Sequence, residues 1–158
     1  MKFTALDVLV CPGCKTALVL HAAVVEGHEI LAGSLTCSSC DTHYPIRDGV
    51  PRFVPDGMYA SSFGRQWNWF RTVQLDSASG TSRSEDALRG ATGWSDDLYR
   101  GRRLLDAGVG AGRFAERAAS KGAEVFGVDL TTACRVLPSS GMDETGRARL
   151  HPAAPLQR

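Results

Sequence analysis

Four of the five cysteines in this 158-residue sequence fall into two tight pairs. Each pair has two residues between its cysteines and twenty-two residues separate the pairs, which are Cys11 and Cys14, then Cys37 and Cys40. Zinc prefers four thiolates in a tetrahedron at about 2.3 Å, and a two-residue gap lets both sulfurs of a knuckle face one ion. We expect Gly13 to supply the tight turn of the first knuckle and Pro12 to stiffen its entry. The spacing therefore predicts a zinc site.

Two disulfides or a thioredoxin-like redox pair are the alternative interpretations of these cysteines. The N-terminal residues lack a secretory signal, which favours a reducing, cytoplasmic setting where disulfides are rare. A redox pair would lie within a βαβ unit rather than among short strands. Four thiolates close the coordination sphere, so the zinc is expected to stabilise a segment too small to fold well alone. The nearby histidines are then expected at the surface; they are His21, His28 and His43.

A second group of residues with chemical potential lies near the middle of the chain. Asp106 ends an apolar run, and Gly108, Gly110 and Gly112 follow it. A second apolar run ends in Asp129. Glycines let the backbone approach a ligand, and an acid at the end of the next strand is placed to accept hydrogen bonds from ribose hydroxyls. The pattern predicts a strand, a glycine loop, a helix and a strand that together bind a nucleotide.

The elements that must position these residues differ along the chain. The segment between the glycine loop and the second strand has a helical apolar face and a C-terminal stop at Gly122; the face consists of Phe114, Ala115, Ala118 and Ala119. Ser82 and Glu85 have the spacing of a capping box, which predicts a short helix there. The first cysteine-bearing half instead has short β-rich runs separated by Gly and Pro.

The residues around the cysteines resemble a known family. Three runs carry the resemblance, namely Leu9–Lys15, Gly33–Cys37 and Tyr44–Pro51. They are similar to the zinc ribbons typified by the small activator subunit of tRNA, rRNA and release-factor methyltransferases. In bacteria such ribbons also occur fused to the front of methyltransferase domains, so the resemblance implies methyltransferase chemistry, in this chain or in a partner.

The glycine loop resembles the first motif of class I S-adenosylmethionine-dependent methyltransferases. It reads G-x-G-x-G rather than the G-x-G-x-x-G of dinucleotide sites, which favours S-adenosylmethionine. The resemblance implies that Gly108, Gly110 and Gly112 line the methionine and adenosyl parts of the cofactor. It also implies that Asp106 holds the loop or the methionine ammonium, and that Asp129 binds the ribose. No catalytic residue is assigned.

The two resemblances together predict a small β zinc ribbon followed by the N-terminal portion of an α/β Rossmann-like methyltransferase fold with an incomplete sheet. We expect the ribbon at 1–58, a helical connecting or lid segment at 59–100, the start of the cofactor domain at 101–130 and an irregular tail at 131–158. The tail lacks periodicity and resemblance, and we interpret it as the product of a frameshift or truncation. Cys134 in it is expected to have no role.

The connecting segment has an aromatic cluster. Trp67 and Phe70 are three residues apart and are expected to pack on the sheet from a helix, although a lid with Arg65 at the substrate side is the alternative. Before the first knuckle, the apolar residues Leu6, Val8 and Leu9 offer a contact to a partner protein.

Composition limits the function classes. A net charge of +1, from 18 basic and 17 acidic residues, argues against bulk nucleic-acid binding and mildly favours a small methyl acceptor over RNA or protein. No apolar run is long enough to span a membrane. The main prediction is an S-adenosylmethionine-dependent methyltransferase, or the N-terminal fragment of one. The alternatives are a non-catalytic ribbon that activates a partner methyltransferase, and an inactive fragment that self-associates through exposed apolar surface.

Overall fold

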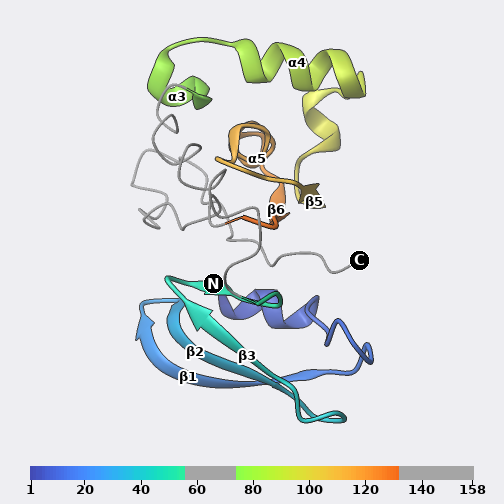
Figure 1. Cartoon of the computed structure of the whole chain (residues 1–158). Helices are drawn as coiled ribbons and strands as arrows, with labels where there is room; N and C mark the ends of the chain where they lie inside the picture. The colour runs from blue at the N-terminus through green and yellow to red at the C-terminus, as the bar shows by residue number, and fades with distance from the viewer. Residues whose placement is uncertain (56–73, 132–158) are drawn as a thin grey trace.

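The structure, a computed structural model, describes residues 1–55 and 74–131 (Figure 1). The first range forms a β ribbon, and the second forms helices packed around a short parallel sheet. The middle residues Arg65, Trp67 and Phe70, the tail at 132–158 and its Cys134 lie outside the described residues, so the interpretations placed on them stay predictions. The boundaries of the four predicted segments also stay predictions.

The ribbon is a four-stranded antiparallel sheet in the order β1-β2-β3-β4. A 3-10 helix, η1, precedes it, and the elements are η1 (Phe3–Asp7), β1 (Leu18–Glu26), β2 (Glu29–Cys37), β3 (His43–Arg47) and β4 (Val50–Pro51). The β3–β4 hairpin turns at Asp48 and Gly49, whose φ angles of 50° and 72° match the Asp-Gly signal of a tight turn. The predicted short strands are therefore confirmed.

The ribbon core lies on one face of the sheet, beneath η1. Alternate residues of β2 and β3 supply most of it, because side chains on a strand point to opposite faces in turn. Its fully or nearly fully buried members include Met1, Ala5, Ile30, Leu35, Tyr44, Ile46 and Phe53. Tyr44 and Phe53 meet edge to face with ring centroids 4.8 Å apart. A core of this size is small, as expected for a segment that needs a metal.

The second unit is a βαβ crossover. It comprises β5 (Arg103–Ala107), α5 (Arg113–Ser120) and β6 (Glu124–Val128), and the two strands pair in parallel. Ala115, Ala118 and Ala119 of α5 are buried, and Gly122 has a φ of 92° just past the helix. The predicted strand, helix and stop are thus confirmed. Within residues 74–131 this sheet has two strands.

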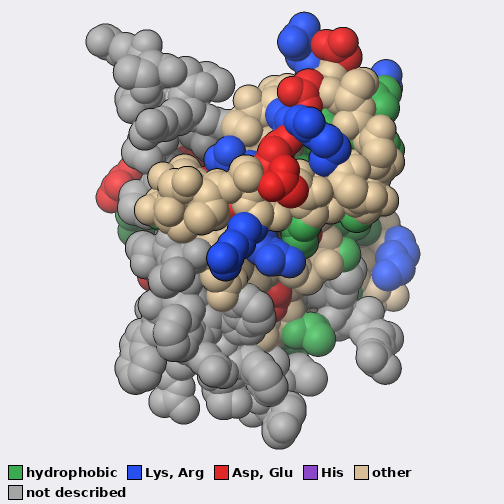
Figure 2. Space-filling view, turned by 90° about the horizontal axis from the view of Figure 1, so that it is seen from above, with side chains coloured by type: hydrophobic (Ala, Val, Ile, Leu, Met, Phe, Trp, Pro, Cys, Tyr) green, Lys and Arg blue, Asp and Glu red, His purple; other side chains and the backbone are tan. Residues whose placement is uncertain are grey.

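Helices cover this unit on the side away from the ribbon. They are α3 (Asp76–Ser79), α4 (Arg83–Thr92) and the 3-10 helix η2 (Asp96–Leu98). Figure 2 views this face and shows Lys and Arg side chains interspersed with Asp and Glu. Lys121 of the α5 C-terminus pairs with Glu85 of α4 at 2.8 Å and with Asp96 of η2. These ion pairs join α5 to α4 and to η2. Because basic and acidic side chains are interspersed, the described residues on this face form no basic stripe.

The ribbon packs against the open face of the β5–β6 sheet. Phe126 and Val128 of β6 contact the ribbon core, and Val50 of β4 contacts Val109 and Val128. In Figure 1 the two strands accordingly lie between α5 and the ribbon. Within the described residues, no helix is both long enough and apolar enough to cross a membrane.

Helix α4 begins where the capping box predicted, but another residue caps it. Ser82 makes no side-chain cap bond and its hydroxyl donates to Asp86 instead. The buried carboxylate of Asp76 accepts from the backbone N–H of Ser84 at 3.1 Å and of Glu85 at 3.0 Å. The helix was therefore predicted correctly and its cap was wrong, because a carboxylate brought by α3 reaches the same N–H groups.

Replacement of this cap should give a pH-dependent loss of stability. Burial raises the pKa of the Asp76 carboxyl, but the N–H groups of Ser84 and Glu85 outweigh it and bring the pKa below its usual value. The carboxylate therefore stabilises the fold above about pH 4, its unfolded pKa, and this contribution is lost as the pH falls through the lower folded pKa. We expect Asp76→Asn to lower the free energy of unfolding at pH 7 by about 1 kcal/mol.

Thermal unfolding of both proteins at pH 7 and pH 3 checks this prediction. The difference between wild type and variant should shrink at pH 3. An equal difference at both pH values would show that the charge of Asp76 contributes nothing.

Candidate metal centre and glycine loop

The four cysteines come together at one end of the ribbon. Their sulfurs all lie within 4.8 Å of one another, and they are Cys11, Cys14, Cys37 and Cys40. The shortest separations are 3.3 Å between the sulfurs of Cys14 and Cys37 and 3.7 Å between those of Cys11 and Cys40. A tetrahedron with Zn–S bonds of about 2.3 Å has edges of about 3.8 Å. The donor set and its spacing therefore fit one zinc ion, as the sequence predicted.

The two knuckles have the same backbone geometry. In the first, the N–H of Cys11 donates to the carbonyl of Thr16 and the N–H of Lys15 to that of Cys11. In the second, the N–H of Cys37 donates to the carbonyl of Thr42 and the N–H of Asp41 to that of Cys37. All four N···O distances lie between 2.8 and 3.1 Å. One loop geometry, used twice, thus turns both cysteine pairs toward a common point.

Gly13 lies in the turn of the first knuckle, as expected, but its backbone conformation does not require a glycine. Its φ is not positive, and the left-handed positions are Lys15 at 63° and Asp41 at 55°. A Cβ added at Gly13 would meet the Cys11 sulfur at an ordinary 3.8 Å. The second knuckle carries Ser39 at the equivalent position, which shows that a side chain is accommodated there. The turns therefore lie at 12–14 and 38–40, and a left-handed residue follows each of them.

Hydrogen bonds stabilise the thiolate forms of Cys11 and Cys37. The hydroxyl of Tyr44 lies 3.3 Å from the Cys11 sulfur and is the largest cause that lowers the pKa of that thiol. The backbone N–H of Cys40 and the hydroxyl of Thr16 lower the pKa of Cys37 to about 5. Burial in turn raises the pKa of Tyr44, so its hydroxyl keeps its proton and acts as a donor. Thiolates are the form that zinc binds.

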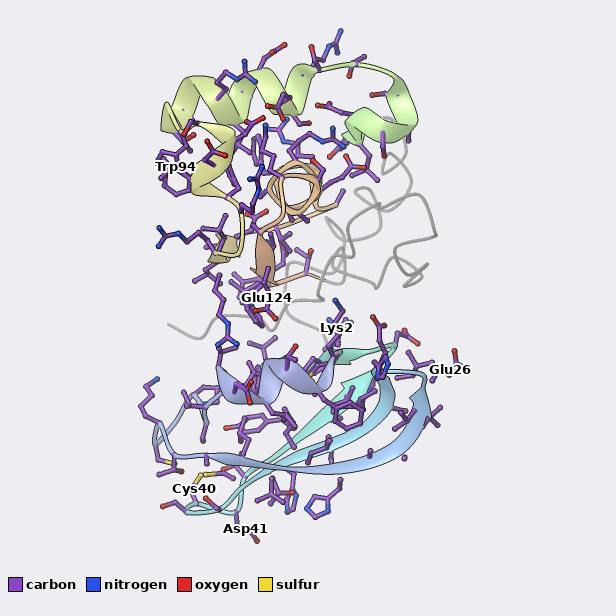
Figure 3. All side chains as sticks on the ribbon, turned by 180° about the vertical axis from the view of Figure 1, so that it is seen from behind. Lys2, Glu26, Cys40, Asp41, Trp94 and Glu124 are labelled. Atoms are coloured by element: carbon purple, nitrogen blue, oxygen red, sulfur yellow. The ribbon has the colours of Figure 1, made fainter. Side chains whose placement is uncertain are left out.

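The histidines of the ribbon stay outside this cluster. His21, His28 and His43 are all exposed, as expected. The ring Nδ1 of His43 lies 2.9 Å from the hydroxyl of Thr36. Figure 3 shows Cys40 and Asp41 at one end of the ribbon and Glu26, at the β1–β2 turn, at the other. The metal site therefore fixes one end of the sheet, while the hairpin closes the other.

The glycine loop lines a cavity of about 510 Å³ at the carboxyl end of β5 and β6. Its lining includes Gly108, Gly110 and Asp129. Gly108, Gly110 and Gly112 have φ angles of 84°, 50° and 88°. Within residues 1–55 and 74–131, no atom lies within 4 Å of a Cβ built at Gly108, and the nearest at Gly110 is 3.9 Å away. The loop thus leaves open space that side chains would otherwise fill.

The two acids of the loop lie in different settings. The carboxylate of Asp129 accepts from the N–H of Gly110 at 2.8 Å and from that of Thr131 at 2.7 Å. Asp106 is half-buried, and its Oδ2 is buried without a hydrogen-bond partner among the residues that the structure describes. Burial is the main cause that raises the pKa of Asp106, with a smaller contribution from Asp129. Asp129 thus holds the loop, and the role expected of Asp106, to hold the loop or the methionine ammonium, stays a prediction.

A second cavity, of about 350 Å³, lies where the ribbon meets the β5–β6 sheet. Its ribbon wall includes Met1, Val8 and Leu9, and its sheet wall includes Leu105 and Phe126. We call it the apolar groove. Two of its large side chains are unusually exposed, with Val8 at 42% and Leu105 at 64%. Of the predicted partner contacts, only Val8 is exposed; Leu6 and Leu9 pack against the ribbon core.

The fold and the metal centre define the first range as a small zinc-ribbon β domain. Residues 2–49 match the family model described as Trm112p-like protein. A UPF0434 protein from Nitrosococcus oceani is 39% identical over 46 residues, which are 29% of this chain and 64% of that protein. The chain thus spans less than two thirds of the length of this curated relative.

One solved structure is similar to the ribbon. It is the complex between the Haloferax volcanii Trm112 methyltransferase activator and a protein assigned as a methyltransferase. The sequence identity is 36% over 37% of this chain and 98% of the matched chain, with a TM-score of 0.34. The expected ribbon-family resemblance is therefore supported for residues 2–49.

These comparisons correct the main functional prediction. A catalytic, S-adenosylmethionine-dependent methyltransferase is contradicted, because the family model that matches, over residues 2–49, is Trm112p-like rather than that of a catalytic domain, and the curated relative is a UPF0434 protein. The error arose because the glycine loop, in a sheet expected to be incomplete, was taken as evidence for methyltransferase activity. A βαβ unit with a glycine loop is shared by many folds, and it defines a site only with the strands that complete it. The prediction of a small methyl acceptor falls with it.

Proposed function

We propose that this chain is a non-catalytic zinc-ribbon module that binds and activates a partner methyltransferase. The observation that carries the proposal is the match of residues 2–49 to the Trm112p-like family. That segment holds the complete cysteine set in a geometry that fits zinc. A closed tetrathiolate site serves structure rather than catalysis, which is what a binding module requires.

The zinc site is placed to fix the surface that would meet the partner. Helix η1 is followed directly by the first knuckle, and the N–H of Leu9 donates to the carbonyl of Ala5 at 3.0 Å. The side chain of Val8, between η1 and Cys11, is held on the wall of the apolar groove. Zinc binding at Cys11 therefore restrains the chain on which this exposed side chain lies.

The apolar groove is the docking surface that we assign to the partner methyltransferase. Exposed large apolar side chains cost solvation free energy and mark binding sites when they line a concave surface. Val8 contributes from the ribbon and Leu105 from β5, so the groove offers a continuous apolar floor across both units. An apolar segment of the partner is the occupant that this lining fits. A second copy of the chain is the competing occupant, and the test below distinguishes the two.

Val8→Glu should weaken the complex at least tenfold, because a carboxylate buried against an apolar partner loses hydration without gaining a hydrogen bond. Val25→Glu is the matched control, since Val25 is 45% exposed on β1 and does not line the groove. Titration calorimetry of the zinc-loaded chain with purified class I methyltransferases of its source organism measures the affinity. Sedimentation of the chain alone reports self-association. Equal affinities for both variants, or a dimer that Val8→Glu dissociates, would contradict the proposed docking.

The glycine loop fits part of a cofactor, and we propose S-adenosylmethionine as its ligand. The open space at Gly108 and Gly110 admits a ligand close to the backbone. A carboxylate has about four acceptor positions, so Asp129 keeps capacity for ribose hydroxyls beside its two backbone bonds. In this proposal Asp106 and Gly112 support the same loop. Calorimetry of the purified chain with S-adenosylmethionine tests this proposed site, and an absence of binding heat would contradict it. Cytoplasmic localisation stays a prediction.

A further inference from the structure

The sulfurs of the metal centre are surrounded by three hydroxyl groups that the zinc-ribbon interpretation does not use. We call these residues, Thr16, Thr42 and Tyr44, the hydroxyl set. The hydroxyl of Thr16 lies 2.9 Å from the Cys14 sulfur and 3.1 Å from that of Cys37. The hydroxyl of Thr42 lies 3.1 Å from Cys40, and that of Tyr44 lies 3.3 Å from Cys11. Each of the four sulfurs therefore has a hydroxyl within hydrogen-bond distance.

The two threonines occupy equivalent positions. Each comes two residues after the second cysteine of its knuckle, and each follows the residue with a positive φ, Lys15 or Asp41. The repeated loop geometry thus delivers a backbone carbonyl to the first cysteine of the knuckle and a hydroxyl to the second. The same arrangement in both knuckles indicates that the hydroxyls are part of the site rather than incidental neighbours.

Tyr44 breaks this symmetry because it reaches the site from β3. Its ring is 7% exposed and packs edge to face on Phe53. Its hydroxyl meets the sulfur of Cys11, a residue with no exposed surface. A buried hydroxyl needs a hydrogen-bond partner, and a thiolate sulfur at this place is an acceptor that water cannot replace.

The charge of a tetrathiolate site explains what the hydroxyl set does. One Zn²⁺ and four thiolates carry a net charge of −2, which is costly in a half-buried site without compensation. The nearest lysine, Lys15, donates to the carbonyl of Pro12 at 2.7 Å. Hydroxyl donors and backbone N–H groups face the sulfurs, among them the N–H groups of Ser39 and Cys40, each 3.4 Å from the Cys37 sulfur. Such outer hydrogen bonds orient metal ligands and tune their basicity.

We propose that Thr16, Thr42 and Tyr44 stabilise the zinc thiolates through hydroxyl hydrogen bonds, the single Thr16 proton being shared by Cys14 and Cys37, and that Tyr44 is the positioning residue of Cys11. The hydroxyl set compensates the negative charge of the site and keeps the sulfurs directed at the metal. It slows both zinc release and attack on the thiolates by electrophiles. This inference rests on zinc as the ion of the four-cysteine site, but it is independent of any partner.

Tyr44→Phe is the central test, because it removes the hydroxyl and leaves the ring on Phe53. We expect zinc affinity, measured by competition with a chromophoric chelator, to fall 10- to 100-fold, and zinc release to excess chelator to accelerate. Ser38→Ala is the matched control, since the Ser38 hydroxyl lies in the second knuckle but donates to the carbonyl of Ala17 at 3.2 Å. It should leave both quantities unchanged.

Cobalt substitution separates a hydrogen bond from simple packing. The energy of the sulfur-to-cobalt charge-transfer band depends on the electron density of the sulfurs, so loss of a donor should shift the band in Tyr44→Phe and not in Ser38→Ala. Thr16→Val, which keeps the shape of the side chain, should lower zinc affinity about tenfold, and it carries the test if Tyr44→Phe does not fold. Unchanged affinity and an unchanged band in the folded variants would overturn the proposal. Zinc content of the wild type, at about one ion per chain, tests the metal itself separately.

Discussion

Replacement of Cys37 by serine is expected to abolish stoichiometric zinc binding and to unfold the ribbon. Cys37 is buried at the end of β2, and its sulfur accepts from the N–H groups of Ser39 and Cys40. Zinc binding contributes about 10–16 kcal/mol to the folding of small zinc domains. This is as large as the whole free energy of unfolding of an ordinary domain. A serine hydroxyl is a poor ligand at neutral pH, so most of that contribution is lost.

Metal analysis together with the dispersion of amide NMR signals from β1 to β4 measures this effect. Ser39→Ala is the matched control in the same knuckle, because the backbone N–H of Ser39, which the substitution keeps, is the group that meets the sulfur. The control should hold about one zinc ion per chain and keep its signals. A folded Cys37→Ser protein without metal would show that the hydrophobic core alone stabilises the ribbon.

Gly33→Ala should destabilise the ribbon by about 3 kcal/mol. Gly33 of β2 has a φ of 152° and pairs with Ala22 beside an irregularity in β1. A Cβ at this position would lie 2.4 Å from the carbonyl oxygen of His21 and 3.1 Å from the Cα of Ala22. Both are backbone atoms that cannot rotate away, so β1 and β2 would have to separate at this pair.

A glycine-to-alanine substitution in a helix should have the opposite effect on stability. Gly90 lies in α4, and a Cβ built there meets no atom within 4 Å. Gly90→Ala is therefore expected to stabilise the chain by about 0.5–1 kcal/mol, since alanine loses less backbone entropy in a helix. Urea unfolding at saturating zinc measures both. If Gly33→Ala unfolds at the wild-type midpoint, the close approach of β1 and β2 is contradicted.

Local patterns in the sequence predicted the site residues of the ribbon well. Two C-x2-C pairs constrain four sulfurs to one place whatever the rest of the chain does, so the cysteine cluster followed from spacing alone. The hydroxyl set was not predicted, although its signal was present. Thr16 and Thr42 both follow their cysteine pairs at the same interval, and this repetition of C-x2-C-x-T is visible in the sequence.

Features that depend on distant segments could not be predicted in this way. The cap of α4 comes from Asp76, eight residues before the nearest N–H group that it accepts, so local spacing pointed to Ser82 instead. The packing of Phe126 and Val128 on the ribbon joins residues more than 70 positions apart in the chain, and no periodicity encodes it. Function was the largest error, because the motif of β5 and its glycine loop was extended to a catalytic activity that the comparisons contradict.

The ribbon and the βαβ unit carry their chemistry in different ways. The ribbon brings its four cysteines together at the metal centre and presents apolar side chains to the β5–β6 sheet. The groove between them keeps Leu105 largely exposed, which is costly for a chain that acts alone. This combination is what the proposed docking of a partner explains.

A reconstituted methyl-transfer assay tests the proposed activation most directly. The zinc-loaded chain is incubated with radiolabelled S-adenosylmethionine and acceptor extract, alone and with each purified class I methyltransferase of its source organism. The proposed function predicts no transfer above background by the chain alone and an increased rate for at least one methyltransferase when the chain is added. Transfer by the chain alone, or no change in rate with any methyltransferase, would contradict it.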